Sequence, residues 1–214
     1  MLSCNTTTQV PTPSPTTITD LSLMDRSWLT GEPCEAPCWY GLELGKTTKD
    51  EAVSTVMALS FIDYGNISKL DRYWDHSVAQ QLSFGCKLPA GAICTSFIFV
   101  DDTLVYIHLT PNYPITFGEV VEQIGEPDFI GAEYTVPETR DCAAELIWLD
   151  RQMQVIYYEF HRSSGRDLCG EIIDAGNKPP SDLVVHNVMY LLPDYFKDVP
   201  VHNQHYSWQG FAEP

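Results

Sequence analysis

The sequence predicts an α+β protein built as a tandem repeat, in which each unit packs a helix on one face of a three- to four-stranded antiparallel sheet. Two observations predict this architecture. Residues 48–56 and 116–124 follow one pattern, T-x-x-E-[AV]-V-x-x-[VI]. Each of these segments is followed, in the same order, by runs of aromatic and β-branched residues that are typical of strands.

Both repeated segments carry the signature of a helix start. Thr48 precedes Glu51 by three residues, and Thr116 precedes Glu119 in the same way. This spacing is a capping box, in which the threonine hydroxyl accepts from the first turn and the glutamate accepts from the cap. Apolar residues at helical spacing place one face of each helix on a core. Gly125 is expected to end the second helix.

The strands are expected to form hairpins. Residues 97–109 and 146–158 each consist of a β run, a polar turn and a second β run. A further strand is expected before each hairpin, at residues 81–86 and 129–136. Residues 64–80 are expected to be a polar loop inserted in the first unit.

The remainder of the chain is less regular. The Gly- and Pro-rich residues 163–180 are expected to be a loop, and residues 183–192 a strand, with a helix as the alternative. The C-terminal aromatic residues either cover a sheet edge or form a binding patch.

Short motifs carry a resemblance to known proteins. Gly45–Thr48 leads into the first expected helix, and Ile124–Asp128 ends the second. These motifs, together with the order of helices and strands, resemble the fold shared by the β-lactamase inhibitor proteins and the small lipoprotein of the outer-membrane barrel-assembly machinery. The motifs P-C-W-x-G (Pro37–Gly41) and W-Q-G-F (Trp208–Phe211) are also similar to those of uncharacterised, predicted bacterial lipoproteins. The resemblance to the repeat fold covers about residues 33–160 and specifies fold better than function.

The N-terminus resembles that of a bacterial lipoprotein. A small residue precedes Cys4, and a run of Thr, Pro and Ser follows it as far as residue 20. The resemblance implies a lipid on Cys4 and an extended linker. A signal peptide is missing or truncated, so Met1 is not established as the true start, and a free cysteine in a tail is the alternative. The expected organisation is residues 1–27 as anchor and linker, 28–112 and 113–197 as the two repeats, and 198–214 as a tail that packs on the second repeat.

Six further cysteines suggest a disulfide framework. We expect the pairs Cys34–Cys38, Cys86–Cys94 and Cys142–Cys169, on the basis of local spacing and flanking turns. Free buried thiols and a zinc site are the alternatives, but no histidine lies within four residues of any cysteine. Disulfides imply an oxidising compartment outside the cytoplasm.

Composition limits the partners. The formal net charge is −17, from 12 basic and 29 acidic residues. This charge repels phosphate backbones and anionic lipid, so we expect no nucleic-acid partner and membrane contact only through a lipid anchor. We expect a monomer.

The sequence contains no recognisable catalytic set, and we expect no catalytic residue, no cofactor and no metal. Asp101 and Asp102 are assigned to turn chemistry. His202 and His205 form H-x-x-H, but their surroundings favour extended chain and no third ligand is evident. Tyr73 and Trp74 lie among charges and are candidates for partner contact, with packing of the loop as the alternative.

These observations predict an acidic, secreted, membrane-anchored lipoprotein that acts as a non-catalytic binding or cell-envelope module. The exposed side of the sheet is its expected contact face. Two other functions stay open at this point: an extracytoplasmic hydrolase with an unrecognised site, and an inhibitor of a secreted enzyme.

Overall fold

The computed structural model describes residues 21–74, 77–136, 139–160, 164–193 and 205–212. The predictions for Cys4, for the linker up to residue 20 and for His202 therefore lie outside the described residues. Within the described residues, no helix is long and apolar enough to cross a membrane.

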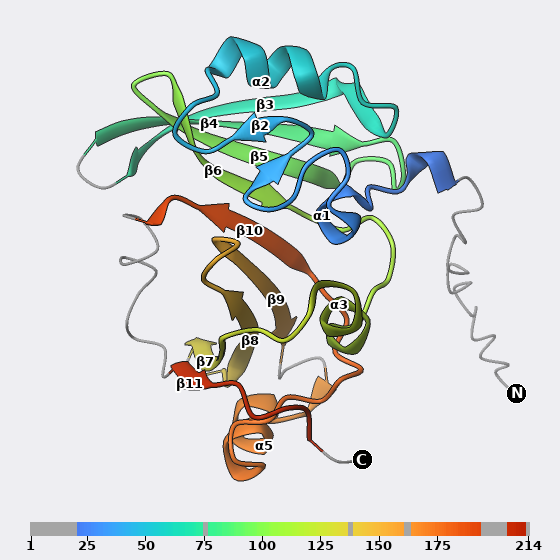
Figure 1. Ribbon diagram of the computed structural model, residues 1–214, viewed down its shortest axis with the longest axis vertical. Helices are drawn as coiled ribbons and strands as arrows, with labels where there is room; N and C mark the ends of the chain where they lie inside the picture. The colour runs from blue at the N-terminus through green and yellow to red at the C-terminus, as the bar shows by residue number, and fades with distance from the viewer. Residues whose placement is uncertain (1–20, 75–76, 137–138, 161–163, 194–204, 213–214) are drawn as a thin grey trace, which may run out of the picture.

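Most strands of the described chain belong to one antiparallel sheet of nine strands (Figure 1). Its spatial order is β11-β7-β8-β9-β10-β6-β5-β4-β3. A separate two-stranded hairpin consists of β1 (Cys38–Trp39) and β2 (Leu42–Glu43). The strands of the large sheet are β3 (Ile62–Trp74), β4 (Ser77–Cys86), β5 (Ile93–Val100), β6 (Thr103–Leu109), β7 (Phe129–Val136), β8 (Asp141–Trp148), β9 (Met153–Glu159), β10 (Asn187–Leu191) and β11 (His205–Ser207).

The predicted tandem repeat of a helix plus a small sheet is wrong, because β10 joins all the strands into one sheet. This strand pairs with β6 on one side and with β9 on the other. Val188, for example, lies opposite both Leu109 and Val155. The repeated sequence patterns describe helix starts and hairpin turns, which are local features and carry no information about where a sheet ends.

The helices are short. They are the 3-10 helix η1 (Leu21–Leu23), α1 (Ser27–Thr30), α2 (Lys49–Val56), α3 (Phe117–Ile124) and α5 (Leu168–Asp174). Both predicted capping boxes are confirmed: the Thr48 amide donates to Glu51 Oε2 at 2.9 Å, and the Thr116 amide donates to Glu119 Oε2 at 2.8 Å. The predicted end of α3 at Gly125 is also confirmed.

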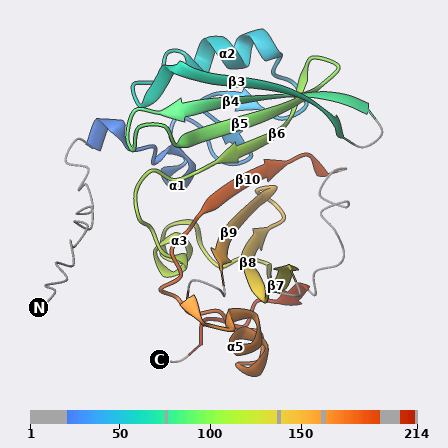
Figure 2. The same cartoon turned by 180° about the vertical axis from the view of Figure 1, so that it is seen from behind.

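The main hydrophobic core lies on the side of the sheet that carries α2, α3 and the β1–β2 hairpin. Ala52 and Val56 of α2, and Phe117 and Val120 of α3, are fully buried in it. Seen from behind, β4, β5 and β6 lie in front of the β1–β2 hairpin (Figure 2). The sheet therefore has one face covered by short helices and one face that no described helix covers.

Two loop predictions are wrong. Residues 64–80 belong mostly to the long β3–β4 hairpin, because β3 is an edge strand, and an edge strand tolerates charges on both faces. The predicted loop at residues 163–180 contains α5. Asp167 caps this helix by accepting from the Gly170 amide at 3.2 Å, and a disulfide at Cys169 fixes it to the sheet.

The C-terminal aromatic segment covers the sheet edge next to β7. Tyr206 of β11 lies opposite Ile130 of β7, and Trp208 and Phe211 pack against the core. The rings of Trp208 and Phe211 meet edge to face, with centroids 5.0 Å apart. Of the two alternatives expected from the sequence, the C-terminal segment therefore covers a sheet edge.

A buried carboxylate fixes the start of the described chain. Asp25 Oδ1 accepts from the Ser27 hydroxyl at 2.7 Å, and Asp25 Oδ2 accepts from Trp39 Nε1 at 2.9 Å. The Asp25 amide donates to Asn112 Oδ1 at 3.3 Å. Burial raises the pKa of Asp25, and these hydrogen bonds oppose that rise. The network therefore connects the segment before α1 to the β1–β2 hairpin and to the chain after β6.

Replacing Asp25 tests this network. We expect Asp25→Ala to lower the free energy of unfolding by about 2–4 kcal/mol, because it leaves the buried Trp39 indole N–H without an acceptor. Asp150→Ala, at an exposed turn, is the matched control and should stay within about 0.5 kcal/mol of the native protein. Urea unfolding measures both changes, and equal losses in the two variants would argue against the network.

Candidate functional site

The six paired cysteines predicted from the sequence are confirmed. Disulfides join Cys34 to Cys38, Cys86 to Cys94 and Cys142 to Cys169. The second links β4 to β5 across their turn, and the third links β8 to α5. These bonds favour an oxidising location outside the cytoplasm.

The predicted contact residues Tyr73 and Trp74 lie on β3 rather than in a loop. Tyr73 lies opposite Val78 and Trp74 opposite Ser77, at the end of the β3–β4 hairpin. They are therefore part of the outermost strand of the sheet.

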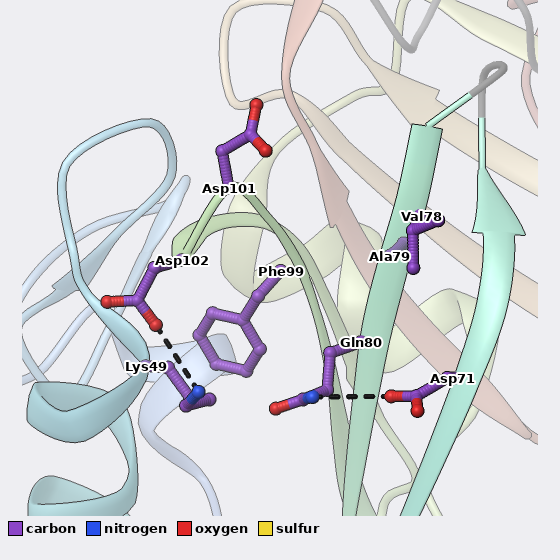
Figure 3. Close-up of a pocket in the computed structure, with 8 residues that line it drawn as sticks. All are labelled: Lys49, Asp71, Val78, Ala79, Gln80, Phe99, Asp101 and Asp102. Carbon is purple, nitrogen blue, oxygen red and sulfur yellow. Dashed lines mark hydrogen bonds and ion pairs between the residues drawn. The ribbon is translucent and has the colours of Figure 1, made fainter.

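A small pocket of about 260 Å³ lies beside the start of α2 (Figure 3). Lys49 Nζ lies 3.5 Å from Asp102 Oδ1 on its rim, whereas Asp101 points away from Lys49. On the opposite side, Gln80 Nε2 donates to Asp71 Oδ1 at 3.3 Å. The complete lining is Lys49, Asp71, Val78, Ala79, Gln80, Phe99, Asp101 and Asp102.

The pocket does not have the features of a catalytic centre. Its volume is below the range of about 300–1,000 Å³ that is usual for small-molecule sites. Asp101 and Asp102 have positive φ angles of 48° and 66°, which agrees with the predicted turn chemistry. Within the part of the chain that the structure describes, no group of three or more His, Cys, Asp or Glu residues could hold a metal ion.

The helix-free side of the sheet presents a second and larger group of polar side chains, which we call the polar face. The strand register places a continuous row on it, from β3 through β4, β5, β6 and β10 to β9. Further residues of these strands and of β8 and β11 project from the same side of the sheet and also belong to the polar face. The polar face consists of Ser68, Ser83, Ser96, Tyr106, His108, Met189, Gln154, Asn187, Glu145, Tyr158 and His205.

Side chains on the polar face bind one another across strands. The Ser96 hydroxyl donates to Ser83 Oγ at 2.7 Å, between β5 and β4. The Tyr106 hydroxyl donates to Met189 Sδ at 2.8 Å, between β6 and β10. The second contact crosses the junction between β6 and β10, so both halves of the sheet contribute to one surface.

Glu145 is the centre of a buried charged cluster on this face. Gln154 Nε2 donates to Glu145 Oε2, and His205 Nε2 lies 3.0 Å from Glu145 Oε1. Glu145 is 4% exposed and Gln154 is 1% exposed. The hydrogen bond to Glu145 raises the pKa of His205. The pair therefore favours a protonated His205, which connects the edge strand β11 to β8.

Glycine at position 131 makes this cluster possible. Gly131 on β7 lies between Glu145 on β8 and His205 on β11. A Cβ atom at this position would lie 2.4 Å from Glu145 Oε1. Any side chain at position 131 would therefore displace the carboxylate from His205.

Two buried polar atoms on the polar face have unused hydrogen-bonding capacity. Gln154 Oε1 and His108 Nε2 have no hydrogen-bond partner among the described residues. Burial lowers the pKa of His108, so its imidazole is neutral near pH 7. Unpaired buried polar atoms cost free energy, so this face of the sheet is not fully satisfied within the described residues.

The polar face combines hydroxyls, amides, imidazoles and a thioether with tyrosine rings. The sequence predicted that the helix-free face would be the contact surface, but it did not identify these residues. The available signal was the position of Glu145 in β8 and of Gln154 in β9, each a polar residue within an otherwise mostly apolar run of a predicted strand.

Comparisons of this chain with protein-family models, with curated proteins and with solved structures found no match.

The His205–Glu145 pair makes stability depend on pH. Because the folded-state pKa of His205 is raised, its contribution is complete below the unfolded pKa of about 6.5 and is lost as the pH rises through the folded value. We expect His205→Gln to cost about 1 kcal/mol at pH 6 and much less at pH 9.

The measurement is the difference in unfolding free energy between the native protein and His205→Gln at each pH. Taking this difference cancels the titration of His108 and His186, whose pKa values are both lowered by burial. A difference that is the same at pH 6 and pH 9 would contradict the assignment.

Gly131→Ala tests the packing of the cluster. We expect a loss of about 1–3 kcal/mol, because the new methyl group overlaps the held carboxylate of Glu145. Gly65→Ala on β3 is the control, since a Cβ there would lie 3.4 Å from Asp63 Oδ1, an ordinary van der Waals contact, and Gly65 does not have a positive φ angle. Comparable losses in both variants, measured by urea unfolding, would show that position 131 is not special.

Proposed function

We propose that this protein is an extracytoplasmic, membrane-tethered module without catalytic activity, which binds a protein or another cell-envelope partner through the polar face. The observation that carries the proposal is the polar face itself. It is a cross-strand surface that no described helix covers, and it holds unpaired buried polar atoms.

The location is supported by the three disulfides, because such bonds persist in oxidising compartments. The tether is supported by sequence alone. Cys4 follows a small residue and precedes a linker rich in Thr and Pro, as in bacterial lipoproteins. A lipid on Cys4 would hold the domain at a membrane, and the linker would set its distance from the bilayer.

The composition of the polar face supports binding. Tyrosine and methionine are enriched at protein interfaces, whereas charged residues are depleted from their centres. On this face the central positions are Ser96, His108 and Met189, and the buried acid Glu145 is already paired. The net charge of −17 adds long-range attraction for a basic partner.

Intact mass measurement tests the tether. We expect protein extracted from membranes to carry a diacylglyceryl group on Cys4 and to have lost six thiol hydrogens. The variant Cys4→Ser should keep the loss of six hydrogens and move to the soluble fraction. An unmodified Cys4 in membrane-extracted protein would refute the lipid anchor without affecting the disulfides.

A capture experiment with matched variants tests the contact surface. Met189→Arg places a charge in the middle of the polar face, and Met57→Arg places the same charge on the helix side, at the end of α2. We expect the native protein and Met57→Arg to retain the same partner from envelope extract, and Met189→Arg to retain at least about tenfold less. Thermal unfolding verifies that both variants are folded. Equal capture by all three proteins would rule out the polar face.

A further inference from the structure

Strand β3 forms one edge of the sheet and is long. It spans Ile62–Trp74, and no strand among the described residues pairs with its outer side. The opposite edge is protected differently, because β11 has only three residues, His205–Ser207. A long open edge presents a row of backbone N–H and C=O groups that can pair with another strand.

The usable part of this edge has an uninterrupted register and carries exposed side chains. The register between β3 and β4 shifts between Asp63 and Ile67, and then runs without interruption from Ile67 to Trp74. Leu70, near the middle of this stretch, is 58% exposed, and Ile67 is 45% exposed. Lys69 and Asp71, on either side of Leu70, are also exposed and project from the opposite side of the sheet.

The order of these side chains is self-complementary. When two copies of β3 run antiparallel about a two-fold axis through Leu70, Lys69 of each copy lies opposite Asp71 of the other. Leu70 then faces its own counterpart, and Ile67 lies opposite Tyr73. Opposite charges in directly facing positions stabilise a strand pair, and apolar pairs do the same.

The neighbouring registers of this strand pair are less stable than the register centred on Leu70. An axis through Lys69 brings two lysines face to face, and an axis through Asp71 brings two aspartates face to face, both of which destabilise a strand pair. The axis through Leu70 also makes the best use of the uninterrupted stretch, since it pairs residues 67–73 of both copies.

We infer that this protein forms a homodimer in which two β3 strands pair antiparallel about Leu70, so that the two sheets become one continuous sheet. The partner is a second copy of this chain, because its charge pattern matches the edge on which it docks. The contact is isologous, so it closes after two copies and does not lead to filaments. It also places the two polar faces on the same side of the joined sheet. The expectation of a monomer from sequence alone is replaced by this proposal.

Charge exchange across the interface is the test, carried out on the full chain with Cys4→Ser so that no intermolecular disulfide can form. Sedimentation equilibrium measures the dissociation constant. Lys69→Glu alone places two like charges opposite each other in both symmetric positions, and Asp71→Lys alone does the same. We expect each to raise the dissociation constant about tenfold or more, and the double variant Lys69→Glu/Asp71→Lys to return to within about twofold of the native value.

Matched controls separate the pairing from net charge. Lys46→Glu and Asp150→Lys change charge equally at exposed positions away from β3, and should leave the dissociation constant within about twofold. A protein that remains monomeric at millimolar concentration overturns the inference. So does a dimer that neither single variant weakens, or one that the double variant fails to restore. None of these results bears on the lipid anchor or on capture through the polar face.

Discussion

The five-residue strand β10 holds this structure together, because its backbone must satisfy hydrogen bonds on both sides. One side pairs with β6 and the other with β9, and Val188 and Tyr190 are completely buried between them. An interior strand without one of its neighbours would leave a row of amides and carbonyls unpaired. The strands that precede α3 and those that follow it are therefore parts of one sheet, although they come from separate stretches of sequence.

The asymmetry between the two faces follows from this sheet. The segments between strands supply α2, α3 and the β1–β2 hairpin to one side, where they bury the main core. Asp25 and the disulfide to Cys169 fix further segments at its borders. The other side keeps polar residues that bind one another across strands, such as Ser83 with Ser96 and Glu145 with His205. The proposed contact surface lies on this side, which no described helix covers.

Local chemistry made part of the fold predictable. The Thr48 and Thr116 capping boxes and the Asp101–Asp102 turn depend on neighbouring residues, so sequence was sufficient to find them. The disulfides were predictable because the cysteines of each pair flank a turn or a hairpin. The strand near residues 183–192 was also predicted, and β10 occupies part of it.

The rest depends on contacts between distant segments. Nothing in residues 187–191 tells which two strands flank them, so the single sheet was missed. The charged residues of β3 resemble a loop until the strand is seen at a sheet edge, where both of its faces tolerate charge. Glu145 and Gln154 were missed because alternation predicts two faces for a strand but does not tell which face other segments cover.

Amide hydrogen exchange followed by NMR tests the central claim most directly. If β10 joins the sheet into one cooperative unit, the amides of Val188, Met189 and Tyr190 exchange as slowly as those in the middle of β5 and β8, and with the same free energy of opening. Fast exchange in β10, together with different opening energies for β3–β6 and for β7–β9, would show two independently stable sheets and contradict the account.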